Sequence, residues 1–244
     1  MIRDILTDIV AHTSSLNFPF AKISSNKTET VIESVFENLT VKLTAKTHNP
    51  IHEFQGTFGL PNLNTLNLLL KNPEYKENPK IEIIVSTRNG KDKPTSIFFE
   101  NEHKDFNNDY QLMSAEVVQS KMDEYVLEEP NYNVVFTPSV NSVQRLKLQA
   151  QIHSEENIFK TKIEKNNLIV SFGGIQSTHV GSFVFQSDIE GKMRNIFNWP
   201  LQDVSSILTL DGDKLISISD EGLMKISVDS GLANYEYFIP AVTK

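Results

Sequence analysis

Few residues of this chain have the spacing that catalysis or metal binding requires. His48 and His52 are four residues apart, which on a helix would put two ligands on one face, but Pro50 lies between them and disfavours a helix. Asp211-Gly212-Asp213 offers carboxylates to a cation, yet the further ligands of a cation-binding loop are missing, so a plain turn is favoured. There is no Gly-rich phosphate loop and no nucleophile elbow. We therefore expect no catalytic residues, no metal site and no cofactor.

Composition excludes several classes of protein. The 244 residues include no Cys, which excludes disulfides, thiolate metal sites and a Cys nucleophile. Lys and Arg number 23 against 31 Asp and Glu, and the net charge of −8 argues against a protein that coats nucleic acid with its whole surface. No apolar run is long enough to cross a membrane. With no targeting signal in view, we expect a soluble, cytoplasmic protein, found in the host cell cytoplasm if it is viral.

The positions of the basic residues are more informative than their number. Arg occurs four times, and Arg3, Arg145 and Arg194 lie in or just before predicted helices. Lys71 ends another predicted helix, and Lys192 lies close to Arg194. Lys and Arg on one shared surface can hold DNA phosphates without reading the bases. A solvated outer face is the simpler alternative, and acidic residues on the same helices mean that any grip on DNA would be loose.

Four segments have the 3.6-residue apolar periodicity of amphipathic helices. Three of them directly follow a Pro, a residue that suits the first turn of a helix. The predicted helices are Ile2–His12, Asn62–Lys71, Ser139–Ile152 and Leu201–Leu210.

Most of the remaining chain is predicted to form short antiparallel strands. These segments are rich in Val, Ile, Phe and Thr and are separated by turn pairs such as Asn-Gly and Asp-Gly. The predicted strands are Val31–Glu37, Leu39–Ala45, Ile81–Thr87, Ser96–Phe99, Tyr110–Ser114, Asn133–Phe136, Ile158–Ile163, Leu168–Phe172, His179–Gln186, Lys214–Ser219, Leu223–Val228 and Tyr235–Ile239.

The predicted elements follow a similar order in the two halves of the chain. Each half has a helix, several strands, a Phe-x-x-Pro stretch (Phe58–Pro61 or Phe197–Pro200), a second helix and three strands. We interpret this order as a weak internal duplication, with chance similarity between two β-rich halves as the alternative. An acidic stretch lies between the halves and indicates a connector. We predict domains at residues 1–118 and 132–244, joined by a connector at 119–131.

This order of elements resembles that of the two-domain DNA sliding clamps, which include PCNA and the processivity clamps of T4-like bacteriophages. Pro61–Lys71 resembles a clamp helix that begins with Asn-Leu and ends on a DNA-facing Lys. Phe136–Leu146 resembles the entry into the second domain, and Ser219–Ala241 resembles the closing hairpin and apolar C-terminal stretch. The resemblance implies an α+β fold of two similar clamp-type domains, with the sheets outside and two helices per domain on the inner face.

The resemblance also implies a function in DNA replication. A sliding clamp of this type is a homotrimeric ring that encircles duplex DNA and tethers the replicative DNA polymerase, and it is a processivity factor rather than an enzyme. An acidic protein can encircle DNA because only the inner wall must be positive. The matching DNA-binding residues are Arg3, Lys71, Arg145, Lys192 and Arg194.

Two further surfaces follow from the resemblance. The polymerase and the clamp loader would dock short peptides in an apolar pocket beside the connector, whereas ordinary core packing is the alternative role of the same residues. These partner-binding residues are Val117, Val126, Leu127, Ile239, Pro240 and Ala241. Edge strands of neighbouring subunits, roughly Asp109–Ala115 and Ile175–Phe183, would pair and close exposed sheet edges. The subunit-interface residues are Tyr110, Leu112, Met113, His179, Val180 and Phe183.

Two other classes of protein compete with a clamp. A two-domain β-rich viral structural protein without a DNA-tethering role would have the same strands, but it would not explain four amphipathic helices at matched places. A β-rich enzyme with dispersed carboxylates would need a pocket with perturbed acids, which a sequence cannot reveal. The Asn-rich composition and the preference for Lys over Arg indicate an AT-rich genome, which is consistent with a bacteriophage.

Overall fold

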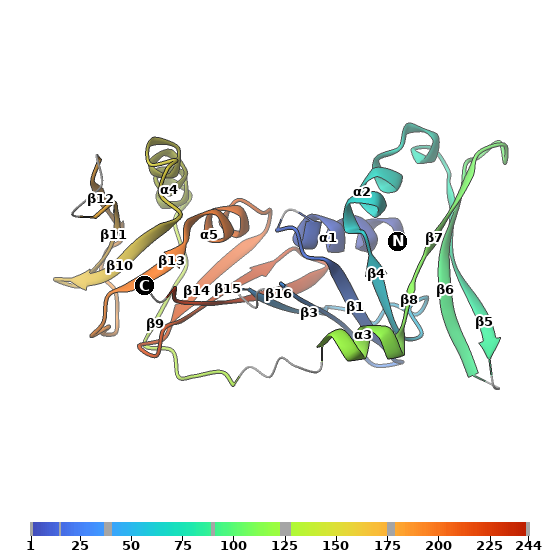
Figure 1. The fold of residues 1–244 in the computed structure, drawn as a ribbon, viewed down its shortest axis with the longest axis horizontal. Coiled ribbons are helices and arrows are strands. Elements are labelled where there is room, and N and C mark those ends of the chain that lie inside the picture. Colours follow the sequence, from blue (N-terminus) through green and yellow to red (C-terminus); the bar gives the residue numbers. More distant parts are fainter. Residues whose placement is uncertain are drawn as a thin grey trace. The chain divides into compact units, whose positions relative to one another are not determined.

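The chain forms two compact units. A computed structural model describes residues 2–14, 16–36, 41–88, 91–122, 128–174 and 179–242. Unit 1 comprises residues 1–126 and 230–235, and unit 2 comprises residues 127–229 and 236–244. Helices and antiparallel sheets occur in both units, as an α+β fold requires (Figure 1).

Unit 1 contains two groups of hydrogen-bonded strands. Strands β8, β4, β1, β2 and β3 lie side by side in that order, and β5, β6 and β7 form a separate three-stranded sheet. The helical elements are α1 (Ile2–Ser14), α2 (Leu63–Lys71), the short 3-10 helix η1 (Pro73–Tyr75) and α3 (Ala115–Met122). The strands are β1 (Phe20–Ser25), β2 (Thr30–Val35), β3 (Lys42–Thr47), β4 (Gly56–Pro61), β5 (Lys80–Arg88), β6 (Lys91–Glu100), β7 (Asn107–Gln111) and β8 (Met113–Ser114).

Unit 2 has a four-stranded sheet in the order β12-β11-β10-β13, and a second group in which β14 lies between β9 and β15. Its helices are α4 (Val140–Ile152) and α5 (Leu201–Leu208). Its strands are β9 (Val134–Phe136), β10 (Ile158–Glu164), β11 (Asn167–Phe172), β12 (Gly181–Gln186), β13 (Phe197–Pro200), β14 (Asp213–Ile218) and β15 (Leu223–Asp229), and the last strand of the chain is β16 (Ala233–Pro240).

The two halves repeat one pattern of strand pairing. In the first half, β1 pairs with β2 and β4, and β2 pairs with β3. In the second half, β10 pairs with β11 and β13, and β11 pairs with β12. The Phe-x-x-Pro stretches end the fourth strands, so that Pro61 lies opposite Phe20 and Pro200 lies opposite Ile158. The prediction of two similar domains is therefore confirmed.

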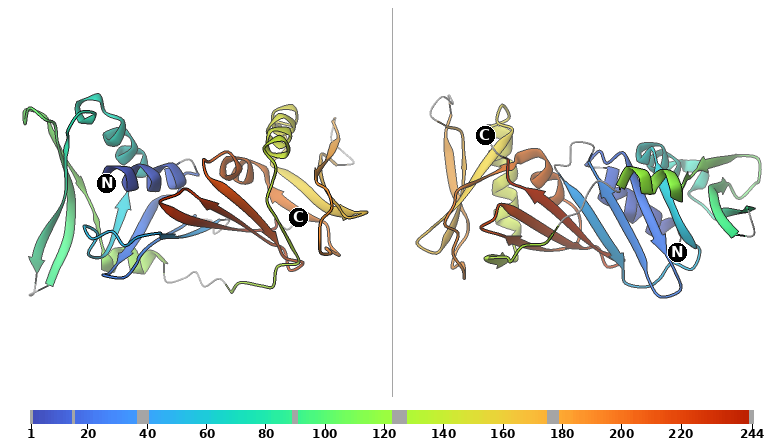
Figure 2. Two further views of the ribbon diagram at one scale, coloured as in Figure 1. Left: turned by 180° about the vertical axis from the view of Figure 1, so that it is seen from behind. Right: turned by 60° about the horizontal axis from the view of Figure 1, so that its bottom comes forward.

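In each half a pair of helices, α1 with α2 or α4 with α5, lies on one face of the adjoining sheet (Figures 1 and 2). All four predicted helices are present, and their ends agree with the prediction to within two residues. Helix α1 packs against α2, and α4 packs against α5. The buried residues of α1 include Ile5, Leu6, Ile9 and Val10, the apolar stripe that predicted the helix. Burying these stripes against the sheets leaves the polar side of each helix pair outward.

Helix α3 differs from the prediction. The sequence predicted no helix at the end of the first domain or in the connector at 119–131, whereas Ala115–Met122 is helical and residues 123–127 lie outside the described part of the chain. Val118 and Met122, four residues apart, are its only buried side chains, so the apolar stripe is too short to stand out in the sequence. Val118 joins Phe20 and Val35 in a small apolar cluster, which attaches α3 to the sheet of unit 1.

Three strands were also missed by sequence reasoning. Two of them, β4 and β13, contain the Gly, Asn and Pro residues of the Phe-x-x-Pro stretches, which are depleted in strands. The third, β1, carries Ala and Ser beside its buried Phe20 and Ile23. These strands form because the neighbouring strands supply backbone hydrogen-bond partners. Local composition does not reveal this tertiary effect.

A polar cluster attaches residues near the C-terminus to the first helix. The Tyr235 hydroxyl donates to Asp8 Oδ2 at 2.7 Å, and the Ser230 hydroxyl donates to the same oxygen at 2.9 Å. The ring of His12 stacks on the ring of Tyr235 with centroids 3.8 Å apart. All four residues belong to unit 1, although Asp8 and His12 are more than 200 positions away from Ser230 and Tyr235 in the sequence.

Gly59 of β4 allows α3 to approach the sheet closely. A Cβ atom at this position would lie 2.6 Å from Cγ2 of Val118, a stiff β-branched side chain. We expect Gly59→Ala to destabilise the protein by about 1–3 kcal/mol through overpacking. Urea unfolding followed by circular dichroism measures this change.

The matched test is the double variant Gly59→Ala with Val118→Ala. Shortening Val118 makes room for the new methyl group, so the double variant should lose less stability than the sum of the two single variants. Strictly additive losses would show that the two side chains do not compete for this space.

Candidate nucleic-acid interface

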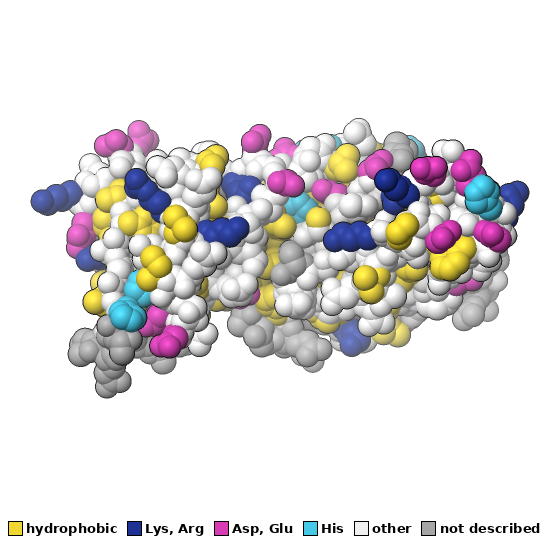
Figure 3. Space-filling view, turned by 90° about the horizontal axis from the view of Figure 1, so that it is seen from above, with side chains coloured by type: hydrophobic (Ala, Val, Ile, Leu, Met, Phe, Trp, Pro, Cys, Tyr) yellow, Lys and Arg dark blue, Asp and Glu magenta, His cyan; other side chains and the backbone are white. Residues whose placement is uncertain are grey.

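The outward sides of the helices are polar but carry few charges. Helix α2 exposes Asn64, Thr65 and Lys71, together with the apolar Leu68. Lys71 is in the last turn, where its charge also suits the negative end of the helix dipole. Figure 3 shows single Lys and Arg side chains spread over the helix-bearing side, with Asp and Glu among them and toward the rim. Such a surface can attract phosphates weakly but cannot hold them tightly.

Arg3 has a different position from the one predicted for a DNA-binding residue. Its guanidinium Nη2 donates to the Leu70 carbonyl at 2.8 Å, and Nη1 donates to the carbonyls of Tyr75 and, at 3.2 Å, Lys76. These acceptors lie at the C-terminal end of α2 and in and just after η1. Arg3 therefore fastens α1 to α2 and caps backbone carbonyls that the helix leaves unsatisfied.

Helix α4 carries two exposed basic residues. It begins after Ser139, whose hydroxyl accepts a hydrogen bond from the Ser142 backbone N–H at 3.1 Å and so caps the helix. Ser142 and Leu146 are its buried residues, so most of its surface is open. Arg145 and Lys147 are both exposed. Unlike Arg3, neither of them hydrogen-bonds to a backbone carbonyl or pairs with a carboxylate within the described part of the chain.

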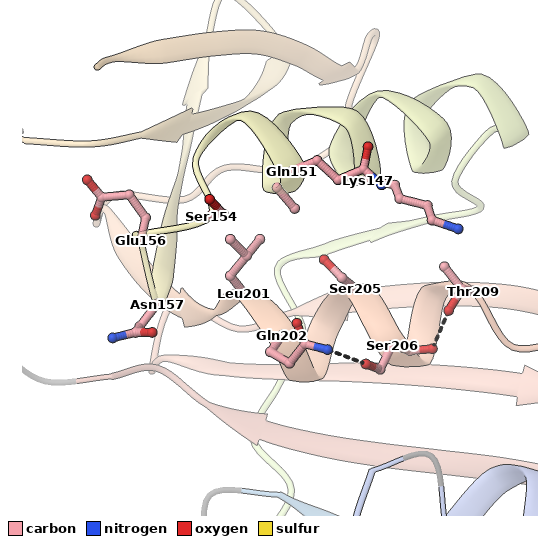
Figure 4. Close-up of a pocket in the computed structure, with 11 residues that line it drawn as sticks. Lys147, Gln151, Ser154, Glu156, Asn157, Leu201, Gln202, Ser205, Ser206 and Thr209 are labelled. Atoms are coloured by element: carbon pink, nitrogen blue, oxygen red, sulfur yellow. Dashed lines mark hydrogen bonds between the residues drawn. The ribbon is translucent and has the colours of Figure 1, made fainter. Parts of the chain in front are cut away.

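A groove of about 440 Å³ runs between α4 and α5 (Figure 4). Lys147 and Gln151 line it from α4, Glu156 and Asn157 line it just after α4, and Ser205, Ser206 and Thr209 line it from α5 and the residue that follows. A second hollow of about 420 Å³ adjoins it, and Lys147 and Thr209 line both. The groove thus presents one amine, one carboxylate and several neutral hydrogen-bonding groups, so it can at most hold a phosphate or sugar loosely.

Sequence reasoning did not single out Lys147. The signal was present, because Gln144, Lys147 and Gln151 follow each other at three- and four-residue intervals and so lie along one side of a helix.

Acidic groups are few on the same two helices. Asp203 of α5 is half-buried, and burial raises its pKa above the usual value of an Asp carboxyl. A raised pKa means that its charged form is disfavoured in the folded protein.

Lys192 and Arg194 lie elsewhere in unit 2. Both are exposed, and the backbone N–H of Arg194 donates to Asp220 Oδ1 at 2.9 Å. Asp220 precedes the turn at Gly222, and the Gly222 carbonyl accepts a hydrogen bond from the Ala241 N–H at 2.8 Å. These two basic residues are therefore beside the C-terminal stretch and not on α4 or α5.

Lys225 holds the end of the connector against the sheet of unit 2. Its ammonium lies 3.0 Å from Glu129 and 3.3 Å from Glu236, and 5.0 Å from the centre of the Tyr132 ring. Burial opposes the charged form of Lys225, but the two carboxylates outweigh burial and raise its pKa above the usual value. Residues 128–132 are thereby fixed beside β15 and β16.

The predicted partner-binding residues have unlike surroundings. In unit 2, Ile239 is fully buried, whereas Pro240 and Ala241 are half-buried. In unit 1, Val117 is exposed on the outer side of α3. Val126 and Leu127 lie outside the described residues. Core packing therefore accounts for Ile239, whereas Pro240 and Ala241 keep part of their apolar surface open within unit 2.

The predicted interface residues fall on two sheet edges. Strands β7 and β12 are each the last strand of their sheet, although residues 175–178 of the predicted edge strand lie outside the described part. Tyr110 is buried, donates to the Pro61 carbonyl, and cannot contribute its side chain to another subunit. Met113 packs against the cluster at Val118, and Leu112 is half-buried. On the other edge, His179 and Val180 are exposed and Phe183 is half-buried.

The described part of the chain contains no group of three or more His, Asp or Glu side chains that could hold a metal ion. None of its helices has the length and apolar character needed to cross a membrane.

Comparison with known proteins identifies the fold. No protein-family model matches the chain, and no curated protein matches its sequence. A structure of A. fulgidus PCNA with the C-terminal region of FEN-1 bound has a TM-score of 0.71 and 10% identity, covering 99% of this chain and 96% of that one. PCNA from Thermococcus kodakaraensis gives 0.68 and 11%, with 99% and 97% covered, and PCNA from Entamoeba histolytica gives 0.65 and 13%, with 98% and 96% covered. The chain has the fold of the PCNA sliding clamps, as predicted.

The contacts of Arg3 lead to a stability prediction. We expect Arg3→Ala to lower the free energy of unfolding by about 1.5–3 kcal/mol, because charged hydrogen bonds to otherwise unsatisfied carbonyls are lost. Arg145→Ala is the matched control and should leave stability nearly unchanged, since Arg145 is exposed. Chemical denaturation of both variants measures the difference, and equal stabilities would show that Arg3 does not fasten the helices.

Proposed function

We propose that this protein is a sliding clamp, a processivity factor that encircles duplex DNA as a homotrimer and tethers a replicative DNA polymerase. The observation that carries the proposal is the clamp fold over nearly the whole chain, with an amphipathic helix pair at the matching place in each half. Each pair has a polar, sparsely charged outward side. That side suits a ring which must slide rather than grip.

The proposed DNA contacts are Lys71 on α2 and Arg145 and Lys147 on α4. All three are exposed and occur on helices whose apolar sides are turned toward a sheet. Arg3, Lys192 and Arg194 are left out of this set because of the positions described above. Neutral Asn, Gln, Ser and Thr side chains on the same helices can hydrogen-bond to phosphates without fixing the ring in one place.

Partner proteins are proposed to dock on unit 2. The C-terminal stretch at Pro240 and Ala241 offers partly open apolar surface, and Lys225 holds residues 128–132 in place nearby. The A. fulgidus PCNA structure has the C-terminal region of FEN-1 bound. By analogy, the polymerase and the clamp loader would each supply a short peptide.

Retention on circular DNA tests the topological part of the proposal. The protein should remain on nicked circular duplex DNA after loading by the clamp loader of its own replication system, and should be lost when a restriction enzyme cuts the circle. Gel filtration of the DNA fraction measures this. Retention that does not depend on the circle would indicate ordinary DNA binding, and failure to associate with DNA would favour a structural protein.

Charge reversal tests the proposed contacts. We expect Lys71→Glu with Arg145→Glu to reduce retention on circular DNA and to lower the slope of its salt dependence by about one for each lost contact. Lys27→Glu with Lys165→Glu is the matched control, because these exposed residues lie in the equivalent turns β1–β2 and β10–β11. Equal effects of the two pairs would show that net charge matters and the helix positions do not.

Subunit pairing through β12 leads to a further prediction. Wild-type protein should have a solution mass three times its 27.7 kDa chain mass. We expect Val180→Asp, at a residue 73% exposed beside the edge of β12, to yield monomers, because a desolvated charge opposes association. Ile196→Asp, at an apolar residue 62% exposed just before β13 at the opposite edge of the same sheet, should remain trimeric. Light scattering measures both, and a trimeric Val180→Asp variant would contradict this interface.

A further inference from the structure

Strand β5 leaves one edge of its sheet open. It pairs with β6 on one side, and no strand within the described residues pairs with its other side. Its side chains include the apolar Ile84 and Val85, which are 39% and 47% exposed. An unpaired strand edge offers a row of backbone N–H and C=O groups to any extended chain.

In the second half of the protein, the edge equivalent to the open edge of β5 is paired with another strand. β5 follows the second helix of the first half and β14 follows the second helix of the second half, so the duplication makes these two strands equivalent. The outer side of β14 is covered by β9, a three-residue strand that precedes α4. The first half has no counterpart of β9 among its described residues.

The missing strand has a measurable effect on burial. In unit 2 an apolar row runs from Ile226 through Ile216 to Phe136, and Ile216 is 2% exposed. In unit 1 the equivalent row runs from Phe99 to Ile81 and stops there. Phe99 is buried but Ile81 is only half-buried.

A second row behaves in the same way. Ile218 is fully buried between Met224 and Val134, whereas Ile83, which lies opposite the buried Ile97, is half-buried. Each of the two rows in the first half thus lacks one apolar residue at the open edge of β5. The two missing residues would be two positions apart on one strand, because alternate residues of a strand share a face.

We propose that the open edge of β5 binds an extended peptide of another protein, which adds an antiparallel strand with apolar residues at two alternate positions. The model for this peptide is β9 itself, in which Val134 and Phe136 enter the core and Val135 is exposed. Main-chain hydrogen bonds would supply affinity and the two apolar side chains specificity.

The local features of β5 set the length of the peptide. The pairing of β5 with β6 shifts register between Ile84 and Val85, so regular pairing along Lys80–Ile84 ends at a bulge. Lys80 and Glu82 form an ion pair of 3.0 Å, which leaves this part of the edge without net charge. A peptide of about four or five residues in the extended state therefore fits. This site is separate from the helices and from the C-terminal stretch, and it does not rest on the proposed clamp function.

A peptide with the sequence of residues 131–138 of this chain is the probe. We expect it to bind the full-length protein and to protect the backbone amides of residues 80–84 from hydrogen exchange, as read by mass spectrometry. The same peptide with methylated backbone nitrogens at the positions of Val134 and Phe136 should bind about tenfold more weakly or not at all, because added strands depend on main-chain hydrogen bonds.

A protein variant provides the second test. Ile83→Lys should weaken peptide binding, whereas Leu215→Lys, an exposed position on the equivalent strand β14, should not. Hydrogen exchange on the unaltered protein keeps the test valid if Ile83→Lys folds poorly. Unchanged exchange at residues 80–84 with saturating peptide, or equal binding of the methylated peptide, would overturn the proposal. Protection that grows with protein concentration alone would show that a second copy covers β5, and this too would overturn it.

Discussion

The pairing of the fourth strand of each half with its first strand is the constraint on which the arrangement of the helices depends. β4 pairs with β1 and β13 with β10, and each fourth strand ends in a Pro that is followed at once by a helix. Because the first helix also leads directly into its half's first paired strand, this pairing fixes where the first helix ends and where the second begins. The helix pairs, and with them every proposed DNA contact, follow from backbone hydrogen bonds at these two places.

Charge is distributed so that few basic side chains are available to contact DNA. Arg3 is committed to carbonyls between α1, α2 and η1, and Lys225 is committed to two carboxylates. Arg145 and Lys147 remain exposed on a helix that has only two buried side chains. A net charge of −8 is therefore compatible with a surface that attracts phosphates, because the sign of the net charge of the whole molecule does not decide the electrostatic potential at one helix.

Apolar periodicity was sufficient to predict α1, α2, α4 and α5, because each buries a stripe against a sheet. It failed where tertiary contacts decide, as in β4 and β13, whose Gly, Asn and Pro residues are poor strand formers, and in α3, whose stripe has only two members. The site was only partly predictable for the same reason. Helical spacing places Arg145 outward, but no local signal shows that Arg3 reaches carbonyls some 70 residues away.

The cluster of Asp8, His12, Ser230 and Tyr235 has a consequence for the order of folding during synthesis. Unit 1 takes most of its residues from the first half of the chain but also includes residues 230–235. The buried His12 and the carboxylate of Asp8 therefore wait for partners until almost the whole chain has left the ribosome. Domains usually fold in the order of their synthesis, but here the unit that starts first is not complete until residue 235 has been made.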